Sequence, residues 1–317
     1  MLLSRRKFLQ NSTTSLAGLA LGTSPIYAGP AGMPHRLLGQ TGEAVSLLSL
    51  GGAHMGNYND LTDAKAVRIM HAAIDGGINF FDNAWNYSEG LSEIRMGLAL
   101  AGGYRQRIFL MSKEINRDPQ IAMAHLEESL KRLGTDYLDL WQFHGISDPD
   151  DPRKIYEDGL LEMALKAKKV GKIRYLGFTG HTRPDLHLEM LKRGHAWDTI
   201  QMPINICDPH YLSFIKHVLP LATERNIGVI AMKALAGTPG KIPATGIATV
   251  AECLRYAMSL PVSSVCSGMD SLERLEQNIA VAKIFKPMSP DELKAILART
   301  APTAQNGRLE SYKSAGA

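Results

Sequence analysis

Three short apolar segments that lead into polar residues at equal spacing limit the fold of this chain more than any other feature. The segments, each typical of a buried parallel strand, occupy residues 79–82, 108–111 and 137–143. They lead into Asp82, Lys113 and His144, and each of the two intervals between these residues is 31 residues long. A strand and its return helix together take about 30 residues, so the three side chains are predicted to lie on one rim, at the carboxyl ends of successive strands. Tyr87, in the loop after the first segment, is predicted to join them.

The same alternation of strand-like and helix-like patterns runs through most of the chain. Further strands are expected at residues 47–51, 173–179, 199–204, 228–233 and 264–268. Helices are expected at residues 63–76, 91–101, 119–133, 154–170, 184–193, 212–225, 249–259 and 271–285. Eight strand–helix units predict an α/β fold, a closed (β/α)8 TIM barrel that forms one domain over residues 35–286.

The barrel segment carries an addition at each end. Glycine at position 42 lies in a turn between residues 35–39 and 43–50, a pattern that predicts an N-terminal β-hairpin, and we expect this hairpin to cap the bottom of the barrel. Residues 287–317 should form a C-terminal helix and a loose tail. A capping box at Ser289 opens the helix at 290–299, and the small, polar chain from Pro302 onward forms the tail.

Residues 1–28 are expected to be a signal peptide rather than part of the fold. Three basic residues at 5–7 form a charged head, an apolar run follows at 16–21, and Ala28 is the expected cleavage position. The apolar run is too short to span a bilayer stably, so no membrane span is expected after cleavage. The string SRRKFL at 4–9 resembles the twin-arginine (Tat) motif, which implies contact with the Tat machinery and export to the periplasm of a bacterium. A disordered basic tail is the alternative.

Composition excludes several classes of protein. The chain has 317 residues, 45% hydrophobic and 21% charged, which is ordinary for a globular protein with a large core. The formal net charge is only +4, and three of the positive charges lie at residues 5–7, so nothing points to nucleic-acid binding. Cys207, Cys253 and Cys266 form no CxxC or Cys/His cluster, which argues against a metal site or a disulfide scaffold.

The four residues on the predicted rim have complementary chemistry. A tyrosine hydroxyl has a reference pKa of about 10, so Tyr87 would hold a proton at neutral pH and donate it to a carbonyl oxygen as hydride reaches the carbon. Lys113 would ease loss of this proton in the reverse reaction, and Asp82 would hold the lysine charged. His144 would offer an N–H to the substrate oxygen. Each residue alone also fits ordinary strand-end packing, but four of them on one rim favour a functional site.

Sequence strings around these residues resemble one enzyme family. NFFDNAWNYSEGLSE, LMSK and WQFH, in this order and preceded by HRLLGQTGEAVSLLSLGG, resemble the aldo-keto reductases over nearly all of residues 35–285. Members of that family reduce aldehydes and ketones, or oxidise alcohols, with a nicotinamide cofactor. The resemblance implies Tyr87 as general acid and base, Lys113 and Asp82 as its modulators, and His144 as the residue that orients the substrate.

The same resemblance implies a cofactor site. Its candidate residues are Thr179, Gln201, Met232, Lys233, Ser267, Arg274 and Asn278. Met232 stands where a tyrosine commonly stacks on the nicotinamide, and Gly268 stands where a phosphate-binding lysine is often found. Arg274 can contact a 2′-phosphate with its planar guanidinium, so NADP(H) is expected ahead of NAD(H).

Other parts of the site are implied less directly. Substrate pockets in such barrels come from the rim loops, in which His54 and Trp85 are candidates. Asn205 is expected close to the nicotinamide carboxamide, as are the side chains of Gln201 and Thr179.

The sequence thus favours reversible hydride transfer between NAD(P)(H) and a small carbonyl or alcohol substrate. The main alternative is a non-catalytic, nucleotide-binding subunit of the same fold that senses redox state or regulates a partner. A metal-dependent barrel hydrolase is disfavoured, because His181, His187 and His195 are too scattered to form a ligand cluster.

Overall fold

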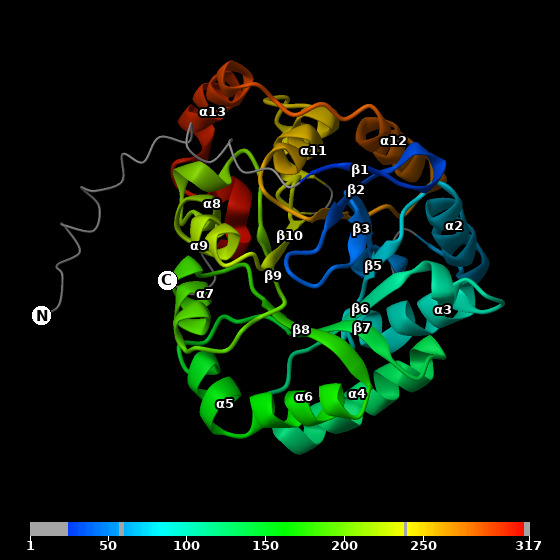
Figure 1. The fold of residues 1–317 in the computed structure, drawn as a ribbon. Helices are drawn as coiled ribbons and strands as arrows, with labels where there is room; N and C mark the ends of the chain where they lie inside the picture. The colour runs from blue at the N-terminus through cyan, green and yellow to red at the C-terminus, as the bar shows by residue number, and fades with distance from the viewer. Residues whose placement is uncertain (1–24, 57–59, 238–239, 314–317) are drawn as a thin grey trace, which may run out of the picture.

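Eight parallel strands close into a barrel in the computed structural model, which describes residues 25–56, 60–237 and 240–313. The strands are β4 (Leu48–Gly51), β5 (Phe80–Asp82), β6 (Phe109–Glu114), β7 (Leu138–Phe143), β8 (Ile173–Thr179), β9 (Thr199–Pro203), β10 (Gly228–Met232) and β11 (Ser264–Ser267). They follow one another around the barrel in chain order, and β11 pairs with β4 to close it. The predicted (β/α)8 barrel is therefore confirmed (Figure 1).

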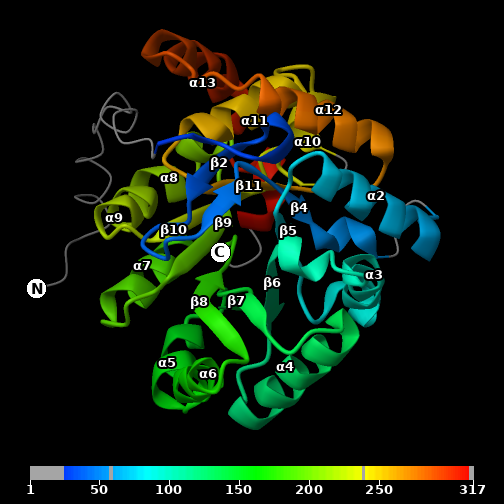
Figure 2. The ribbon, with the colours of Figure 1, turned by 45° about the vertical axis from the view of Figure 1, so that its right-hand side comes forward.

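Helices surround the strands, as Figures 1 and 2 show. They are α2 (Asp63–Asp75), α3 (Leu91–Leu100), α4 (Pro119–Leu133), α5 (Asp151–Glu157), α6 (Leu160–Lys169), α7 (Pro184–Lys192), α8 (Phe214–His217), α9 (Leu219–Glu224), α10 (Lys241–Ala244), α11 (Val250–Ser259), α12 (Leu272–Lys283) and α13 (Pro290–Ala304). Their ends follow local chemistry. Thr249 and Ser289 close capping boxes at the starts of α11 and α13, and Gly134 ends α4 in the left-handed conformation.

Two helices expected to be continuous are each divided in the structure. The helix expected at 154–170 is α5 followed by α6, because Gly159 has a φ of 87° between them. The helix expected at 212–225 is α8 followed by α9, and Pro220 lies in the first turn of α9. Proline has no backbone N–H to continue a helix from the preceding turn, so it favours a new start.

An antiparallel sheet covers the bottom of the barrel, where the strands begin. It contains β1 (Tyr27–Ala28), β2 (Pro34–Leu37) and β3 (Ala44–Ser46), so the predicted hairpin is present and gains a short third strand. A Cβ atom at Gly39, in the turn, would lie only 2.2 Å from the backbone nitrogen of Gly228 at the start of β10. The turn therefore needs a glycine to approach the barrel this closely.

Apolar side chains join this sheet to the barrel interior. Leu38 and Val45 form one buried cluster with side chains that point inward from the strands, namely Phe80, Phe109, Met111, Leu140 and Ile230. A second and larger cluster lies between the strands and the helices. The interior is consequently filled from below, and a cavity opens at the opposite rim, where the strands end.

The C-terminal tail, residues 302–313, corrects one expectation. We expected a loose chain from Pro302, but α13 continues through Pro302 to Ala304, and a 3-10 helix, η7 (Arg308–Lys313), follows. Tertiary contacts outweigh the proline here, because Thr300 is buried and donates a hydrogen bond to the carbonyl of Ile206 at 3.0 Å. Lys313 is only 1% exposed.

Most of the expected signal peptide, residues 1–24, lies outside the described residues. Within the described ranges, no helix combines the length and apolar character needed to cross a membrane. The domain boundaries set from the sequence stay predictions.

Arg36 on β2 offers a test of how the bottom sheet is attached. Its side chain is fully buried and donates hydrogen bonds to the carbonyls of Leu260 at 3.1 Å and Val262 at 2.8 Å. Arg36→Leu would leave both carbonyls without this donor, so we expect the free energy of unfolding to fall by about 3 kcal/mol, measured by urea denaturation. Arg107→Leu, which breaks an exposed ion pair with Asp75, is the control and should cost less than about 1 kcal/mol. Equal effects of the two substitutions would contradict the anchoring role.

Candidate active site

Three neighbouring strands bring the four predicted catalytic residues to one point on the rim. Asp82 is the last residue of β5, Lys113 lies near the end of β6, and His144 follows β7 directly. Tyr87 opens the short helix η4 (Tyr87–Gly90) in the loop after β5. Because these strands are parallel and adjacent, their carboxyl ends place the four side chains together.

Lys113 is the centre of this group. Its ammonium donates hydrogen bonds to the carboxylate of Asp82, to the carbonyl oxygen of Asn83 at 2.7 Å and to the hydroxyl of Tyr87 at 3.2 Å. The lysine side chain is 1% exposed. All three ammonium protons are therefore directed at oxygen atoms, which a buried cation requires.

Burial and charge act in opposite directions on Tyr87 and Lys113. Burial raises the pKa of Tyr87 to about 12, although the nearby ammonium of Lys113 lowers it. Burial alone would lower the pKa of Lys113, but the charges of Asp82 and Tyr87 overcome this effect, so its pKa is raised. At neutral pH Lys113 is therefore positively charged, and the hydroxyl of Tyr87 keeps its proton. Lys113 lowers the pKa of Tyr87, as expected, but burial raises that pKa by more.

His144 lies beside the phenol as a neutral imidazole. Its ring meets the ring of Tyr87 edge-on, with centroids 5.7 Å apart. Burial, with the charge of Lys113 next in size, lowers the pKa of His144 well below its usual value. Its Nδ1 atom is buried and has no hydrogen-bond partner among the described residues. The ring therefore retains hydrogen-bonding capacity next to the hydroxyl of Tyr87.

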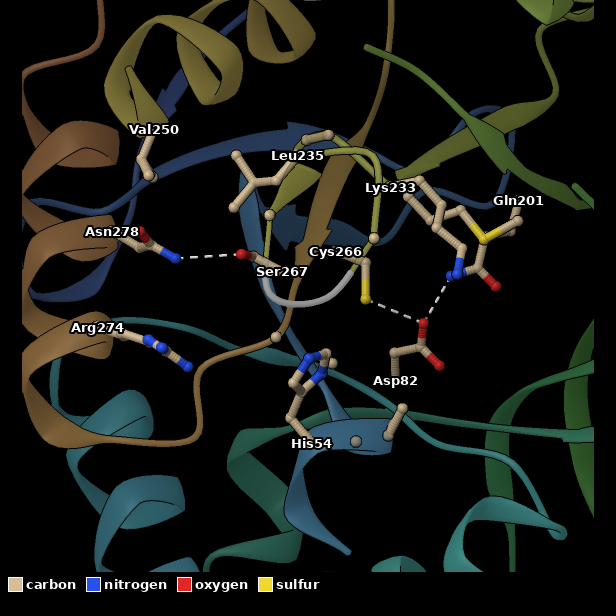
Figure 3. Close-up of a pocket in the computed structure, with 18 of the residues that line it drawn as sticks. His54, Asp82, Gln201, Lys233, Leu235, Val250, Cys266, Ser267, Arg274 and Asn278 are labelled. Carbon is tan, nitrogen blue, oxygen red and sulfur yellow. Dashed lines mark hydrogen bonds between the residues drawn. The ribbon is translucent and has the colours of Figure 1, made fainter. Parts of the chain in front are cut away.

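Asp82 has two further donors that the sequence did not indicate. Gln201 donates its side-chain amide N–H to the second carboxylate oxygen of Asp82 at 2.6 Å, and the thiol of Cys266 lies 3.1 Å from the same oxygen (Figure 3). Burial and the Asp82 charge raise the pKa of the Cys266 thiol, so it stays protonated and can donate. A single cysteine on a strand gives no signal of such a role, and only the barrel closure of β11 onto β4 reveals it.

A cavity of about 250 Å³ opens beside this group. Asp82 and Cys266 lie at one end of it and Arg274 at the other (Figure 3), and Tyr87 also lines it. The predicted cofactor residues that line it are Gln201, Met232, Lys233, Ser267, Arg274 and Asn278. Five glycines of the β4 and β10 loops and of the end of β11, at positions 51, 52, 237, 240 and 268, also line it. Leu235, Val250 and Gln277 also line the cavity. Leu235 and Val250 are apolar, so nothing in the sequence marks them as residues of a binding site.

Thr179 and Trp85 lie elsewhere than expected. Thr179 pairs with Gln201 across the β8–β9 ladder but is buried and does not line the cavity. Trp85 turns toward α4, where its ring stacks on His125 at 3.5 Å and its indole N–H donates to Glu128 at 2.8 Å. The indole finds both an aromatic and a polar partner there, so it does not line the cavity as a substrate-contacting residue would. His54, the other candidate, does line the cavity.

The adenosine end of the predicted cofactor site is built around α12. Asn278 donates to the hydroxyl of Ser267 at 3.1 Å, which links α12 to the end of β11. Arg274 pairs with Asp270, rather than with Glu273 or Glu276, and its side chain is 49% exposed. The guanidinium is therefore accessible to a ligand and held by one carboxylate.

No group of three or more histidine, cysteine, aspartate or glutamate side chains within the described residues is arranged to hold a metal ion.

Comparison with known proteins identifies the family. A family model described as "Aldo/keto reductase family" matches residues 47–241. The chain belongs to the aldo/keto reductase family. It is thus an oxidoreductase, and the match runs from β4 past β10, a segment that includes all four predicted catalytic residues.

Relatives of this aldo/keto reductase cover most of its length. L-galactose dehydrogenase of Arabidopsis thaliana is 27% identical over 83% of this chain and 93% of its own. The uncharacterised oxidoreductase YrpG of Bacillus subtilis (strain 168) is 32% identical over 65% of this chain and 67% of its own. Among solved structures, the holo form of the aldo-keto reductase AKR11C1 from Bacillus halodurans has a TM-score of 0.72 at 27% identity, covering 84% of this chain and 96% of that one. An aldo/keto reductase from Klebsiella pneumoniae in complex with NADP and acetate has a TM-score of 0.67 at 25% identity, with 84% and 95% covered.

The tail of this reductase reaches the rim, a feature that its small, polar sequence did not reveal. Asn205, two residues after β9, donates to the carboxylate of Glu310 at 2.9 Å and to the hydroxyl of Tyr312 at 3.0 Å. The ammonium of Lys233 lies 5.4 Å from the centre of the Tyr312 ring. Asn205 is therefore held by the tail, and Tyr312 forms part of the rim surface beside the cavity residue Lys233.

A buried ion network fixes the tail in place. The ammonium of Lys313 donates to Asp208 at 2.6 Å, to Glu310 and to the carbonyl of Tyr211 at 2.9 Å. The side chains of Lys313 and Asp208 are 0% exposed. Among the described residues, Lys313 is the cation paired with both carboxylates, which otherwise accept hydrogen bonds from neutral donors.

Removal of this charge should be costly. Lys313→Met leaves Asp208 and Glu310 buried without their cation, so we expect the free energy of unfolding to fall by about 3–5 kcal/mol in urea denaturation. Lys286→Met, at an exposed lysine between α12 and α13, is the matched control and should have little effect. An unchanged denaturation midpoint in Lys313→Met would contradict the role given to the network.

Proposed function

We propose that this enzyme transfers hydride reversibly between NADP(H) and a carbonyl or alcohol substrate, with Tyr87 as the general acid and base. One observation supports the proposal above the others. The phenol of Tyr87 lies 3.2 Å from a buried ammonium, which is itself held by a buried carboxylate. A permanent cation beside a protonated phenol is suited to moving one proton to or from an oxygen atom.

In the direction of reduction, Tyr87 donates its proton to the substrate oxygen. The reduced nicotinamide, when bound, supplies the hydride that the carbonyl carbon receives. Negative charge that develops on the carbonyl oxygen is stabilised by the hydroxyl of Tyr87 and by an N–H of His144. Lys113 then stabilises the phenolate that proton donation leaves behind. In the direction of oxidation the phenolate accepts the alcohol proton, so that both directions use the same group.

The residues of the cavity fit a nicotinamide dinucleotide. The side-chain oxygen of Gln201 is buried and has no hydrogen-bond partner within the described residues, while its N–H is held by Asp82. An oxygen in this state is suited to accept a hydrogen bond from the carboxamide of a nicotinamide. Lys233 and Arg274 supply positive charge for phosphates. The preference for NADP(H) rests on Arg274 and on the NADP bound in the Klebsiella pneumoniae relative.

Replacement of Tyr87 tests the chemistry apart from binding. Tyr87→Phe removes the proton donor but keeps the ring, so we expect kcat/KM for NADPH-dependent reduction of an aldehyde panel to fall by about 10³-fold, measured by NADPH absorbance. The dissociation constant for NADPH, measured by protein fluorescence, should change little. Tyr104→Phe is the control, because Tyr104 stacks on His71 away from the rim.

The pH profile adds a second readout to this experiment. The raised pKa of Tyr87 keeps the phenol protonated, so reduction should be nearly constant between about pH 6 and pH 9. Oxidation of the alcohol requires the phenolate, so its rate should rise over the same range. Reduction by Tyr87→Phe at the rate of the unaltered enzyme would refute the assignment. Tight dinucleotide binding with no turnover of any substrate in the unaltered protein would instead favour the redox-sensing or regulatory alternative.

We also propose that the protein is exported by the Tat machinery and functions in the periplasm. The motif at residues 4–9 and the order of charged, apolar and small residues up to Ala28 support this. Cleavage after Ala28 would remove β1, whose two residues are exposed and pair with β2, and would leave β2 and β3, most of whose residues are buried, in place. The mature enzyme would therefore lose little core on cleavage.

Export can be tested on the full chain. Replacement of Arg5 and Arg6 together by lysine should retain the protein, uncleaved, in the cytoplasmic fraction of a bacterium with an active Tat pathway, as judged by fractionation and mass spectrometry. The unaltered chain should appear in the periplasmic fraction, shortened at its N-terminus. Arg107→Lys is the control, because Arg107 is an exposed arginine that lies outside the signal. Periplasmic recovery of the Arg5/Arg6 variant would contradict Tat export.

A further inference from the structure

The imidazole of His54 occupies space that a side chain at position 268 would need. His54 belongs to the short helix η3 (Gly52–Met55), which follows β4, and Gly268 follows β11, the neighbouring strand. A Cβ atom at Gly268 would lie 2.1 Å from Nδ1 of His54 and 2.5 Å from its Cγ atom, far closer than real Cβ contacts. Gly268 does not have a left-handed φ, so its backbone does not require glycine. The glycine is needed because the imidazole packs against it.

This ring lies among the cationic groups of the cavity. Figure 3 shows His54 on the cavity wall, between Arg274 on one side and Asp82 on the other. Burial lowers the pKa of His54, the charge of Asp270 raises it, and the charges of Lys233 and Arg274 lower it further. These interactions place the imidazole within electrostatic range of both cations that line the cavity. A bound anion would stabilise the protonated ring, whereas the protein alone disfavours it.

We propose that His54 binds a phosphate group of the nicotinamide dinucleotide, from the space beside Gly268 that its imidazole occupies. This proposal rests on the dinucleotide function proposed above and assigns one of its contacts. The geometry supports it through the cavity, the position next to Gly268 and the neighbouring cations. Phosphate is the part of a dinucleotide that an imidazole in a cavity also lined by Lys233 and Arg274 would recognise.

Binding at this position should be coupled to protonation. A phosphate beside the ring raises the pKa of His54 in the complex above its value in the free enzyme, so binding takes up a proton. Dinucleotide affinity contributed by His54 is therefore greatest at low pH and decreases as the pH rises through the pKa of the complex. Asp270 facing the ring favours the proton in both states, and Lys233 and Arg274 oppose it in both.

The experiment measures binding rather than turnover. Dissociation constants for NADPH and NADH are measured by protein fluorescence at pH 6.5 and pH 8 for the unaltered enzyme, His54→Gln and the control His195→Gln, a histidine on the connection before β9 that contacts Trp197. We expect His54→Gln to weaken binding about tenfold at pH 6.5, a loss typical of one charge-assisted hydrogen bond, and to flatten the pH dependence. The control should match the unaltered enzyme.

The two dinucleotides distinguish the phosphates. A loss confined to NADPH would place His54 at the 2′-phosphate, and an equal loss for NADH would place it at the pyrophosphate. Unchanged affinity for both dinucleotides in His54→Gln would overturn the proposal. Failure of the unaltered enzyme to bind either one would instead overturn the proposed function, so the two failures are distinguishable.

An exchange of volumes gives an independent check. Gly268→Lys alone should weaken NADPH binding, because the new side chain and the imidazole compete for one space, whereas His54→Ala with Gly268→Lys should restore it by supplying a cation in the vacated volume. Circular dichroism and thermal unfolding are used to check that both variants fold. NADPH binding by Gly268→Lys as tight as in the unaltered enzyme, or no recovery in the folded double variant, would contradict the proposal.

Discussion

A buried ammonium is the interaction on which the rest of this site depends. Lys113 lies inside the barrel, so its charge is tolerable only where carboxylate, carbonyl and hydroxyl oxygens take all of its protons. Asp82 supplies the charge, the backbone of Asn83 supplies a neutral acceptor, and Tyr87 supplies the hydroxyl. Because the ammonium needs three acceptors, it holds the end of β5 and the loop that carries Asn83 and Tyr87 in position. The position of the Tyr87 hydroxyl beside the ammonium satisfies one of the lysine's three hydrogen bonds.

Asp82 extends this arrangement across the barrel. One of its oxygens holds Lys113 from β6, and the other accepts from Gln201 on β9 and Cys266 on β11. A single carboxylate thus connects the residues expected to move the proton with a residue expected to hold the nicotinamide. Since Gln201 uses its N–H for this contact, its oxygen is left for a ligand, and the orientation of the amide is set by the carboxylate rather than by the cofactor.

The sequence predicted the barrel and the meeting of the four polar residues on one rim, because both follow from periodic, local signals. Strand ends that recur every 31 residues place Asp82, Lys113 and His144 on one rim by geometry alone. Features that depend on contacts between distant segments were not predictable. Trp85 was expected at the substrate, but Glu128 and His125 on α4 provide it with better partners.

The tail was misjudged for the same reason. Its small, polar composition is typical of loose chain, and nothing in the local sequence indicates that Lys313 meets Asp208, more than a hundred positions earlier. Proline inside α13 also argued for a helix end, and only the buried contacts of Thr300 override it. Local sequence patterns therefore predict the helices and strands of this fold, but they do not predict contacts between distant segments such as that of Lys313 with Asp208.

The anchoring of the tail affects how the rim is completed during synthesis. Residues 308–313 leave the ribosome after every strand of the barrel, so the eight strands can close before Tyr312 and Glu310 reach Asn205. The nascent enzyme would then pass through a stage in which the barrel is closed but the tail does not yet cover Asn205 at the rim. Proteolytic removal of residues 308–313 would take Lys313 away from Asp208, so the clipped enzyme would be less stable and its rim would also be lined differently.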